Sequence, residues 1–263
     1  MPSGALDRIN RVKLLTLARD LKRRKARERR GLFVAEGVRV VEELLRSPLP
    51  ITGVLVAPQL EDAPRGRELR AALELRGVDV VAVEPRELAS AAETESPQGV
   101  LAIATATIHD LETFDPALVS RFVVLDGVQD PGNVGTIIRT AAALGAVVIA
   151  LPGTVDLWNA KVIRGAMGAH FHVPSFSSTW SGLGSFLDRQ QIPLWAADAS
   201  GTTLTPAATR PPMLALAVGN EGAGISEAVR ARAAQLVSIP IAPGVESLNV
   251  AVATGILLYA LRA

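Results

Sequence analysis

Three glycine-containing turns in the second half of this 263-residue chain carry the residue types that could bind a ligand and do chemistry. Their sequences are PGNVGTIIRTAAALG (131–145), GNEGAGIS (219–226) and IPIAPGVESLNVAVATG (239–255). Each one joins an expected strand to an expected helix, and turns at the carboxyl ends of parallel strands face the same crevice. The spacing therefore predicts that the three turns converge on one small ligand.

The second turn places polar side chains beside bare backbone. Gly219 and Gly222 flank Asn220 and Glu221, directly after an apolar run of strand length. The turn conformation alone explains the two glycines, but it gives no reason for an amide and a carboxylate between them. We therefore interpret this turn as offering backbone N–H and C=O groups, together with polar side chains, to a ligand.

The other two turns also admit a purely structural interpretation. Asn133 stands where a helix is expected to begin, and Arg139 follows about two turns later, a pair that is common on ordinary helices. Ser247 and Asn249 open the last expected helix, and Ser247 is its expected N-cap. Taken singly these residues need no function, and only their combination with the second turn points to a site.

Common catalytic and binding motifs are missing from the sequence. The stretch GVQDPGNVG (127–135) lacks the G-x-G-x-x-G pattern of dinucleotide-binding proteins, and there is no phosphate-binding loop or G-x-S-x-G nucleophile elbow. The absence of cysteine excludes disulfides, thiolate zinc sites and cysteine nucleophiles. Of the three histidines, His109, His170 and His172, the last two alternate along a strand-like stretch without a nearby carboxylate or thiol. We expect structural or surface histidines and no metal site.

Charge is unevenly distributed along the chain, although the net charge is only +1. Residues 1–30 contain eleven Lys/Arg and three Asp/Glu, a local charge of +8, whereas residues 31–263 contain sixteen against twenty-three, a charge of −7. Such a segment is either the solvated face of an amphipathic helix or an electrostatic footprint for a polyanion. The density of cations in KRRKAR (22–27) favours nucleic acid, so we predict nucleic-acid contacts for Lys22, Arg23, Arg24, Lys25 and Arg27.

Hydrophobic periodicity divides the chain into two α/β domains. In the first, residues 1–106, we expect helices over 10–30, 36–46 and 65–76 and strands over 33–35, 51–57, 78–83 and 99–106. The polar stretch 107–117 is the expected linker. In the second, residues 118–263, we expect strands over 122–125, 146–151, 193–197, 213–218 and 236–241. We expect helices over 134–144, 157–167, 182–190 and 248–261, with a short turn near 226–233. Continuous apolar strands separated by helices predict a parallel sheet covered on both faces.

The bulk composition is that of a globular protein, with 49% hydrophobic and 20% charged residues. No apolar run reaches membrane-spanning length. The N-terminus carries charge where a signal peptide needs an apolar core, so we expect no membrane association and a cytoplasmic location.

Together and in this order, the three turns resemble those of the SpoU/TrmH family of RNA ribose 2′-O-methyltransferases, within the SPOUT class. The matching residues are Asn133-x-Gly135-x-x-x-Arg139, GNEG (219–222), and Ile239-Pro240 running to SLNV (247–250). This resemblance covers about residues 120–263. The first 106 residues resemble the family's substrate-binding domain, which has a ribosomal-protein-like fold, through segments 12–45 and 96–104.

The resemblance implies an α/β enzyme with a deep trefoil knot in its C-terminal parallel-sheet domain, S-adenosylmethionine as cofactor, and a homodimer with each active site near the subunit interface. It implies cofactor contacts from Gly219, Ile239 and Leu248, with Asn220 and Val250 as neighbours. It implies catalytic or substrate roles for Arg139, Asn133, Glu221, Ser247 and Asn249. Lys161 and Arg164 match the family loosely, and two interpretations stay open for them: an RNA contact, which we predict for Arg164, or an exposed helix face.

The chemistry constrains what Arg139 does. A methyl group on a sulfonium is already a strong electrophile, so no metal is needed, and the difficulty lies in the weakly nucleophilic ribose 2′-hydroxyl. A guanidinium has a pKa above about 12 and is a poor base. We therefore expect Arg139 to stabilise the forming alkoxide and to anchor a phosphate, while Glu221 orients a guanidinium or a loop.

Several functions stay open within this resemblance. Ribosomal RNA is the favoured substrate, because the first domain resembles an RNA-recognition module and the chain has no long basic C-terminal extension of the kind some transfer-RNA-modifying members carry. The alternatives are the same reaction on transfer RNA, methylation of ribosomal RNA for self-resistance to an antibiotic, and a non-catalytic RNA-binding or ribosome-assembly factor. A non-catalytic factor would be expected to have lost the turn motifs or Arg139. This sequence retains all three turn motifs and Arg139.

Overall fold

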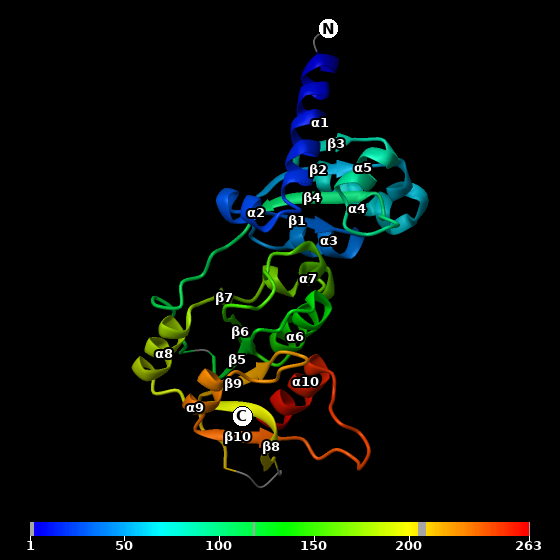
Figure 1. Ribbon diagram of the computed structural model, residues 1–263. Coiled ribbons are helices and arrows are strands. Elements are labelled where there is room, and N and C mark those ends of the chain that lie inside the picture. The colour runs from blue at the N-terminus through cyan, green and yellow to red at the C-terminus, as the bar shows by residue number, and fades with distance from the viewer. Residues whose placement is uncertain (1–2, 118, 205–208, 263) are drawn as a thin grey trace. The chain divides into compact units, whose positions relative to one another are not determined.

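A computed structural model describes residues 3–117, 119–204 and 209–262 and resolves two compact units (Figure 1). The first unit is Met1–Ile108 together with Trp158–His172, and the second is His109–Leu157 together with Val173–Ala263. The sequence had placed residues 158–172 in the second domain. In the structure their aromatic side chains pack in the first unit, where Phe33 lies 4.7 Å from the ring of Trp158 and 5.6 Å from that of Phe171.

The first unit is built on a mixed four-stranded sheet in the order β1-β4-β2-β3. Strand β4 is antiparallel to both β1 and β2, and β2 is parallel to β3. The strands are β1 (Leu32–Glu36), β2 (Ile51–Val56), β3 (Val80–Ala82) and β4 (Val100–Thr105). The helices are α1 (Ser3–Asp20), α2 (Arg24–Arg30), α3 (Val38–Arg46), the 3-10 helix η1 (Pro58–Asp62), α4 (Pro64–Leu75), α5 (Pro85–Ala91), α7 (Ala160–Gly165) and the 3-10 helix η2 (Ala169–Phe171).

Alternation along the strands gives this sheet two apolar faces. In β4, Val100, Ala102 and Ala104 face a cluster with residues of α3, α4 and α7. Leu101 and Ile103 face the opposite cluster, with residues of α1 and α5. Because both faces are covered by helices, the strands read as continuous apolar runs, and this is why the sequence predicted them.

The single helix predicted over residues 10–30 is wrong. Helix α1 ends at Asp20 and α2 begins at Arg24. The break is stabilised by Arg27, whose buried Nη1 donates to the carbonyl oxygens of Leu21 and Lys22, both at 2.8 Å. Carbonyls at a helix C-terminus lack intrahelical partners, so this guanidinium takes the place of the next helical turn.

The second unit is built on an all-parallel six-stranded sheet in the order β10-β8-β9-β5-β6-β7, as the apolar strand runs predicted. The strands are β5 (Arg121–Asp126), β6 (Ala146–Ala150), β7 (Ser175–Ser177), β8 (Leu194–Thr203), β9 (Leu214–Gly219) and β10 (Gln235–Ser238). The helices are α6 (Pro131–Ala143), α8 (Trp180–Arg189), α9 (Glu227–Arg232) and α10 (Val250–Ala260). Helices α8 and α9 cover one face, while α6 and α10 contact each other and also contact β6 and β9, respectively (Figure 1).

Two other expectations from the sequence are wrong in detail. The strand predicted over 236–241 ends at Ser238, because Pro240 has no N–H for a ladder, and the segment 239–249 that follows has no regular structure. His170 and His172 do not alternate along a strand, since residues 169–171 form the 3-10 helix η2. His170 is buried with its ring 5.6 Å from that of Trp158, and Nε2 of His172 lies 3.3 Å from Oε2 of Glu43.

Candidate active site

The sheet of the second unit brings the turn after β5 and the turn after β9 to one edge. These strands are parallel neighbours, and their last residues, Asp126 and Gly219, are paired in register. The buried Asp126 also accepts a hydrogen bond from the backbone N–H of Ser226 at 2.6 Å, which ties the far end of the second turn to β5. Two of the three turns therefore start from adjacent positions.

Glu221 joins these two turns through its carboxylate. Oε1 accepts from the backbone N–H of Asp130 at 3.2 Å and from Nδ2 of Asn133 at 3.0 Å. Oε2 accepts from the backbone N–H of Gln129 at 3.3 Å. One carboxylate from the GNEG turn thus receives three donors from the turn and first helical residues after β5.

Asn133 extends this network to the third turn. Its Oδ1 accepts from Nδ2 of Asn249 at 2.9 Å. Because the same amide donates to Glu221, its oxygen and nitrogen are both engaged, which fixes its orientation. We call Glu221, Asn133 and Asn249, one residue from each predicted turn, the three-turn cluster.

The helix caps at this site differ from those predicted. Helix α6 begins at Pro131 and its N-cap is Asp130, whose Oδ1 accepts from the backbone N–H of Asn133 at 2.7 Å. Asn249, and not Ser247, caps α10, since its Oδ1 accepts from Ala251 N at 2.9 Å and Val252 N at 3.2 Å. Sequence reasoning missed Asp130, although an acidic residue directly before a proline is a recognisable helix start. Because Asp130 caps the helix, the side-chain amide of Asn133 is free to form the hydrogen bonds of the three-turn cluster.

The GNEG turn is held in shape by Asn220. Its Oδ1 accepts from the backbone N–H of Gly222 at 2.9 Å and of Ala223 at 3.0 Å, and its Nδ2 donates to the carbonyl of Gly127 at 3.0 Å. A Cβ at Gly219 would lie 2.2 Å from the backbone of Gly224, so this position has room only for glycine. Asn220 therefore positions the turn, and Gly219 allows the close approach of two backbone segments.

The network decides the ionisation of Glu221. Burial raises the pKa of this carboxyl, but hydrogen bonds from the Asn133 side chain and from backbone N–H groups outweigh it, so the pKa lies below the ordinary value. A carboxylate with a lowered pKa and occupied lone pairs is a weak proton acceptor. Glu221 is therefore suited to orienting the turns and poorly suited to being a general base.

The remaining predicted site residues lie outside this hydrogen-bonded cluster. Arg139 is on the exposed side of α6 and forms no hydrogen bond or ion pair with any residue that the structure describes. Ser247 and Leu248 are exposed in the segment before α10, Ile239 is partly exposed at its start, and Val250 is the first residue of α10. Exposed backbone in this segment and an unengaged guanidinium leave room for a ligand beside an already organised network.

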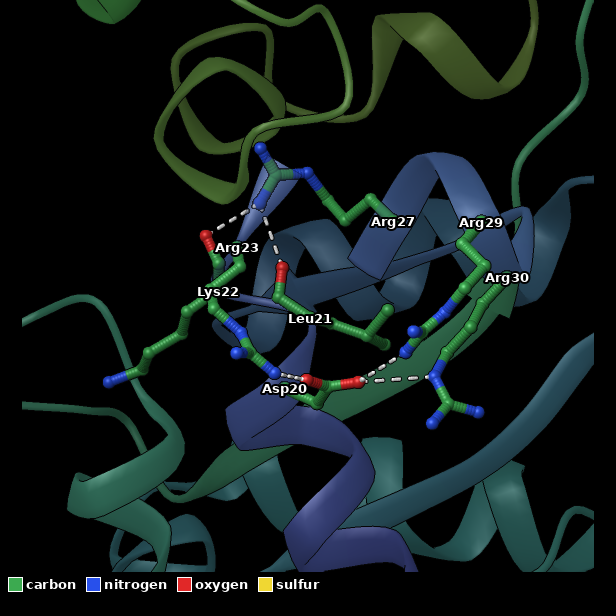
Figure 2. A network of polar contacts seen from close by, with 7 residues as sticks. All are labelled: Asp20, Leu21, Lys22, Arg23, Arg27, Arg29 and Arg30. Atoms are coloured by element: carbon green, nitrogen blue, oxygen red, sulfur yellow. Dashed lines mark hydrogen bonds and ion pairs between the residues drawn. The ribbon is translucent and has the colours of Figure 1, made fainter. Parts of the chain in front are cut away.

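The basic segment forms a helical hairpin around one carboxylate (Figure 2). Asp20 accepts from Arg23 and from Nε of Arg30 at 3.2 Å, and Nη2 of Arg29 lies 3.6 Å from it. The hydrogen bond from Arg23 is the main reason that the pKa of Asp20 lies below its ordinary value. Three guanidinium groups around one ionised carboxylate leave a net positive surface at this hairpin.

Of the six cations predicted to bind RNA, five belong to this hairpin, and four of these five lie on its outside. Lys22, Arg23, Arg24 and Lys25 are exposed, although Nζ of Lys22 donates to the carbonyl of Ser90 at 3.1 Å. Arg27 is the exception, because it is buried and bonded to the end of α1. We therefore correct its role to one of positioning the hairpin.

Neither a metal centre nor a membrane span is found in the described part of the chain. No three or more His, Asp or Glu side chains among residues 3–117, 119–204 and 209–262 are grouped so that they could hold a metal ion. Burial lowers the pKa of His109, which favours its neutral form. Within the same ranges, no helix is both long enough and apolar enough to cross a membrane.

The fold and the site define an α/β protein in which the turns predicted to bind a ligand lie at the carboxyl edge of a parallel sheet, and in which a second, smaller unit has a mixed sheet. Residues 120–259 match the SpoU rRNA Methylase family, and residues 10–102 match the MRM3-like substrate binding domain. The chain belongs to the SpoU rRNA methylase family, which confirms the resemblance seen in the sequence.

Similar proteins cover almost the whole chain. The 23S rRNA (guanosine(2553)-2′-O)-methyltransferase RlmP of Bacillus subtilis is 34% identical over 91% of this chain and 92% of its own. The 23S rRNA (uridine(2479)-2′-O)-methyltransferase of Streptomyces viridochromogenes is 31% identical over 90% and 84%, respectively. A crystal structure of the SpoU methyltransferase AviRb from Streptomyces viridochromogenes, in complex with the cofactor AdoMet, superposes with a TM-score of 0.82 at 29% identity, covering 94% of this chain and 96% of that one.

We expect Glu221→Gln to weaken the three-turn cluster in a pH-dependent way. The pKa of Glu221 lies below 4.5, so its stabilising contribution is complete above pH 4.5 and is lost as the pH falls through the lowered pKa. At pH 7 the variant should lose about 1 kcal/mol of unfolding free energy, a small value because the carboxylate is largely exposed. Urea unfolding measured between pH 3 and pH 8 tests this.

The matched control for this prediction is Glu246→Gln, which removes the same charge from an exposed carboxylate without a hydrogen-bond partner among the described residues. The prediction would be contradicted if Glu221→Gln lost no more unfolding free energy at pH 7 than the control. It would also be contradicted if the loss of unfolding free energy were as large at pH 3 as at pH 7.

Proposed function

We propose that this chain is an S-adenosylmethionine-dependent methyltransferase that modifies a ribose 2′-hydroxyl in large-subunit ribosomal RNA. The observation that carries the proposal is the three-turn cluster, because it joins Glu221, Asn133 and Asn249 from three distant segments at one edge of the parallel sheet. Membership of the SpoU rRNA methylase family and the activities in the names of the two curated relatives support the reaction and the substrate.

The turns fit a cofactor that is held by backbone groups. Gly219, Ile239 and Leu248 would provide most of these contacts, with Asn220 and Val250 beside them. The fit is supported by the exposed residues of the irregular segment 240–249. When bound, S-adenosylmethionine supplies a methyl group on a sulfonium, which is electrophilic enough to need no metal.

The residues of the chain would then have to activate and align the ribose oxygen. Arg139 is the group best suited to this task, because its guanidinium is exposed and has no protein partner among the described residues. It would stabilise negative charge on the 2′-oxygen and hold an adjacent phosphate by charge-assisted hydrogen bonds. Glu221 and Asn133 would position the turns, while Ser247 and Asn249 stand at the start of α10 where substrate contacts are proposed.

Methyl transfer measured with labelled S-adenosylmethionine on unmodified ribosomal RNA and, separately, transfer RNA tests this function. We expect label in ribosomal RNA, and Arg139→Ala should reduce the rate by about 100-fold or more while cofactor affinity is retained, because the guanidinium acts on the oxyanion. Arg76→Ala, at an exposed arginine in the first unit, is the control and should keep full activity.

Other outcomes of the same assay decide against the proposal. Label only in transfer RNA would overturn the substrate, and no label together with no cofactor binding would overturn the reaction and favour a non-catalytic factor. An Arg139→Ala variant with near-normal rate would remove Arg139 from the chemistry.

The basic hairpin is proposed to bind RNA phosphates without reading sequence. Replacing Lys22, Arg23, Arg24 and Lys25 by Gln should lower the salt dependence of RNA binding, with the slope of log K against log salt reduced by about three, since each phosphate contact contributes about 0.7–0.9. Fluorescence anisotropy between 50 and 300 mM salt measures the slope. Arg76→Gln should change the slope by less than the contribution of one phosphate contact. An unchanged slope in the quadruple variant would show that the hairpin does not bind the RNA phosphates.

The exposed face of α10 is proposed to pair with a second copy of the chain. Val252, Ile256 and Tyr259 are 52%, 44% and 54% exposed and recur at helical spacing, so they form one apolar stripe. The same patch of two identical chains can meet about a two-fold axis. Asn249 of the three-turn cluster lies one turn before Val252, so a partner on this stripe would lie close to the site.

We expect Ile256→Asp to convert a dimer into a monomer, because it buries an unpaired charge at the centre of the stripe. Light scattering coupled to gel filtration measures the mass. Leu75→Asp is the control, since Leu75 is 91% exposed in the first unit and should not affect assembly. A monomeric wild type, or a dimeric Ile256→Asp variant, would contradict the proposed interface.

Two further expectations stay predictions. The deep trefoil knot is supported by the path of the last segment, which leaves β10 at the sheet edge and returns to α10 against α6 and β9. The backbone trace of an experimental structure tests it. A cytoplasmic location is supported by the ribosomal RNA substrates of the bacterial relatives, and cell fractionation tests it.

A further inference from the structure

A large cleft in the first unit shares no residue with the three-turn cluster. Its volume is about 820 Å³, within the range of sites that hold small molecules. It lies between the start of α3, the 3-10 helix η1, the first turn of α4, the loop 94–98 and the last turn of α7. All of these segments belong to the same compact unit.

Two residues that line this cleft each carry a buried polar atom without a hydrogen-bond partner among the described residues. The two atoms are Oε1 of Gln59 and Nη1 of Arg164. Buried polar atoms are normally paired, because an unpaired one keeps the cost of losing water without a compensating bond. An acceptor and a donor left unpaired in one cleft therefore point to a polar ligand that bonds to both.

The charges around the cleft favour an anionic ligand. Glu36 is the only carboxylate in its lining, and its oxygens accept from Glu93 N at 2.8 Å, from Thr94 N at 3.2 Å and from the Thr94 hydroxyl. Arg164 and the exposed Arg39 form no ion pair with any described residue. Arg65, which also lines the cleft, is ion-paired with Glu42. The acidic group is thus already satisfied, and Arg39 and Arg164 are the lining cations without an ion pair among the described residues.

The start of α3 adds further donors on the same side. Its N-cap is Gly37, which has no side chain to bond to the helix, and only the first helical N–H, that of Val38, is taken up by Oε1 of Gln98 at 3.0 Å. Free N–H groups at a helix N-terminus attract negative charge. Beside Arg39, this helix end suits a phosphate group.

Apolar side chains also line the cleft. They include Val38, Leu60, Pro97 and Met167. An unstacked nucleobase needs apolar surface together with an amide or a guanidinium, since its faces pack on apolar or planar groups and its edge forms hydrogen bonds. Hydrogen-bond donors for a phosphate, together with polar groups for a base edge, match a nucleotide better than a simple anion.

We propose that this cleft binds one unpaired nucleotide of the RNA substrate. The base lies between the apolar walls with its edge on the Gln59 amide and the Arg164 guanidinium, and its phosphate lies at Arg39 and the first turn of α3. This inference rests on the proposed function, in which the substrate is RNA. It differs from the contacts of the basic hairpin, because phosphate contacts alone carry no sequence information.

Binding of hairpin RNAs to the full-length chain tests the proposal. The probes are a fully paired fluorescein-labelled stem and the same stem with one bulged A, C, G or U. We expect the wild type to prefer at least one bulged stem by about tenfold, the scale of one stacked base. In Gln59→Leu and Arg164→Gln, the ratio of the affinities for the bulged and the paired stem should fall toward one, while affinity for the paired stem changes little. Arg76→Gln removes the same charge elsewhere and should keep the wild-type ratio.

Thermal unfolding of the same variants separates ligand binding from a structural role. Because Gln59 Oε1 and Arg164 Nη1 have no hydrogen-bond partner in the part of the chain that the structure describes, Gln59→Leu and Arg164→Gln should melt at the wild-type temperature or above. A lower melting temperature together with a retained preference for the bulged stem would overturn the proposal and assign both residues to folding.

The outcomes also separate this proposal from the proposed function. Methyl transfer to ribosomal RNA by a wild type that shows no preference for any bulged stem would overturn the cleft alone. A preference that is lost in both cleft variants, without any methyl transfer, would support the cleft and overturn the proposed reaction. A wild type that binds neither stem and methylates no RNA would overturn both.

Discussion

The arrangement of the site depends on the ionised carboxylate of Glu221. Turns at the end of a parallel sheet are exposed and receive no ladder hydrogen bonds, so neighbouring turns need another link. Glu221 provides it by accepting from Gln129 N, Asp130 N and the Asn133 amide. The amide oxygen of Asn133 in turn accepts a hydrogen bond from Asn249, which stands at the start of α10. Three segments separated by many residues become one rigid edge because one carboxylate stays charged.

The same network separates positioning residues from those free to meet substrate. Asn220, Glu221 and Asn133 have their polar atoms engaged within the protein. Arg139 has no such partner among the described residues. A preorganised network and an unengaged cation on the same helix, α6, suit electrostatic stabilisation of a developing oxyanion, since the turns need no rearrangement when charge appears.

The sequence predicted the parallel sheet because strands buried on both faces read as continuous apolar runs, as in β5 and β9. It missed β7 and α5, which have only three and seven residues and too little periodicity. The break at Lys22 was invisible because helical composition continues through it, and only the bonds of Arg27 reveal it. The turns were found from their residue types, but the caps were not, because neighbouring polar residues such as Asp130 and Asn133 suit the N-cap equally well and the backbone decides between them.

The choice of nucleotide needs a different explanation from the chemistry. The curated relatives carry guanosine and uridine in their names, although both are about equally similar to this chain. A site that acts on a ribose 2′-hydroxyl meets a group common to every nucleotide, and a basic hairpin that binds phosphates is equally indifferent to the base. Selection must then come from groups that contact base edges or RNA shape. In the first unit, the proposed nucleotide cleft is lined by Gln59 and Arg164, each with a buried polar atom that has no partner among the described residues. Under this proposal, recognition and catalysis draw on separate sets of residues.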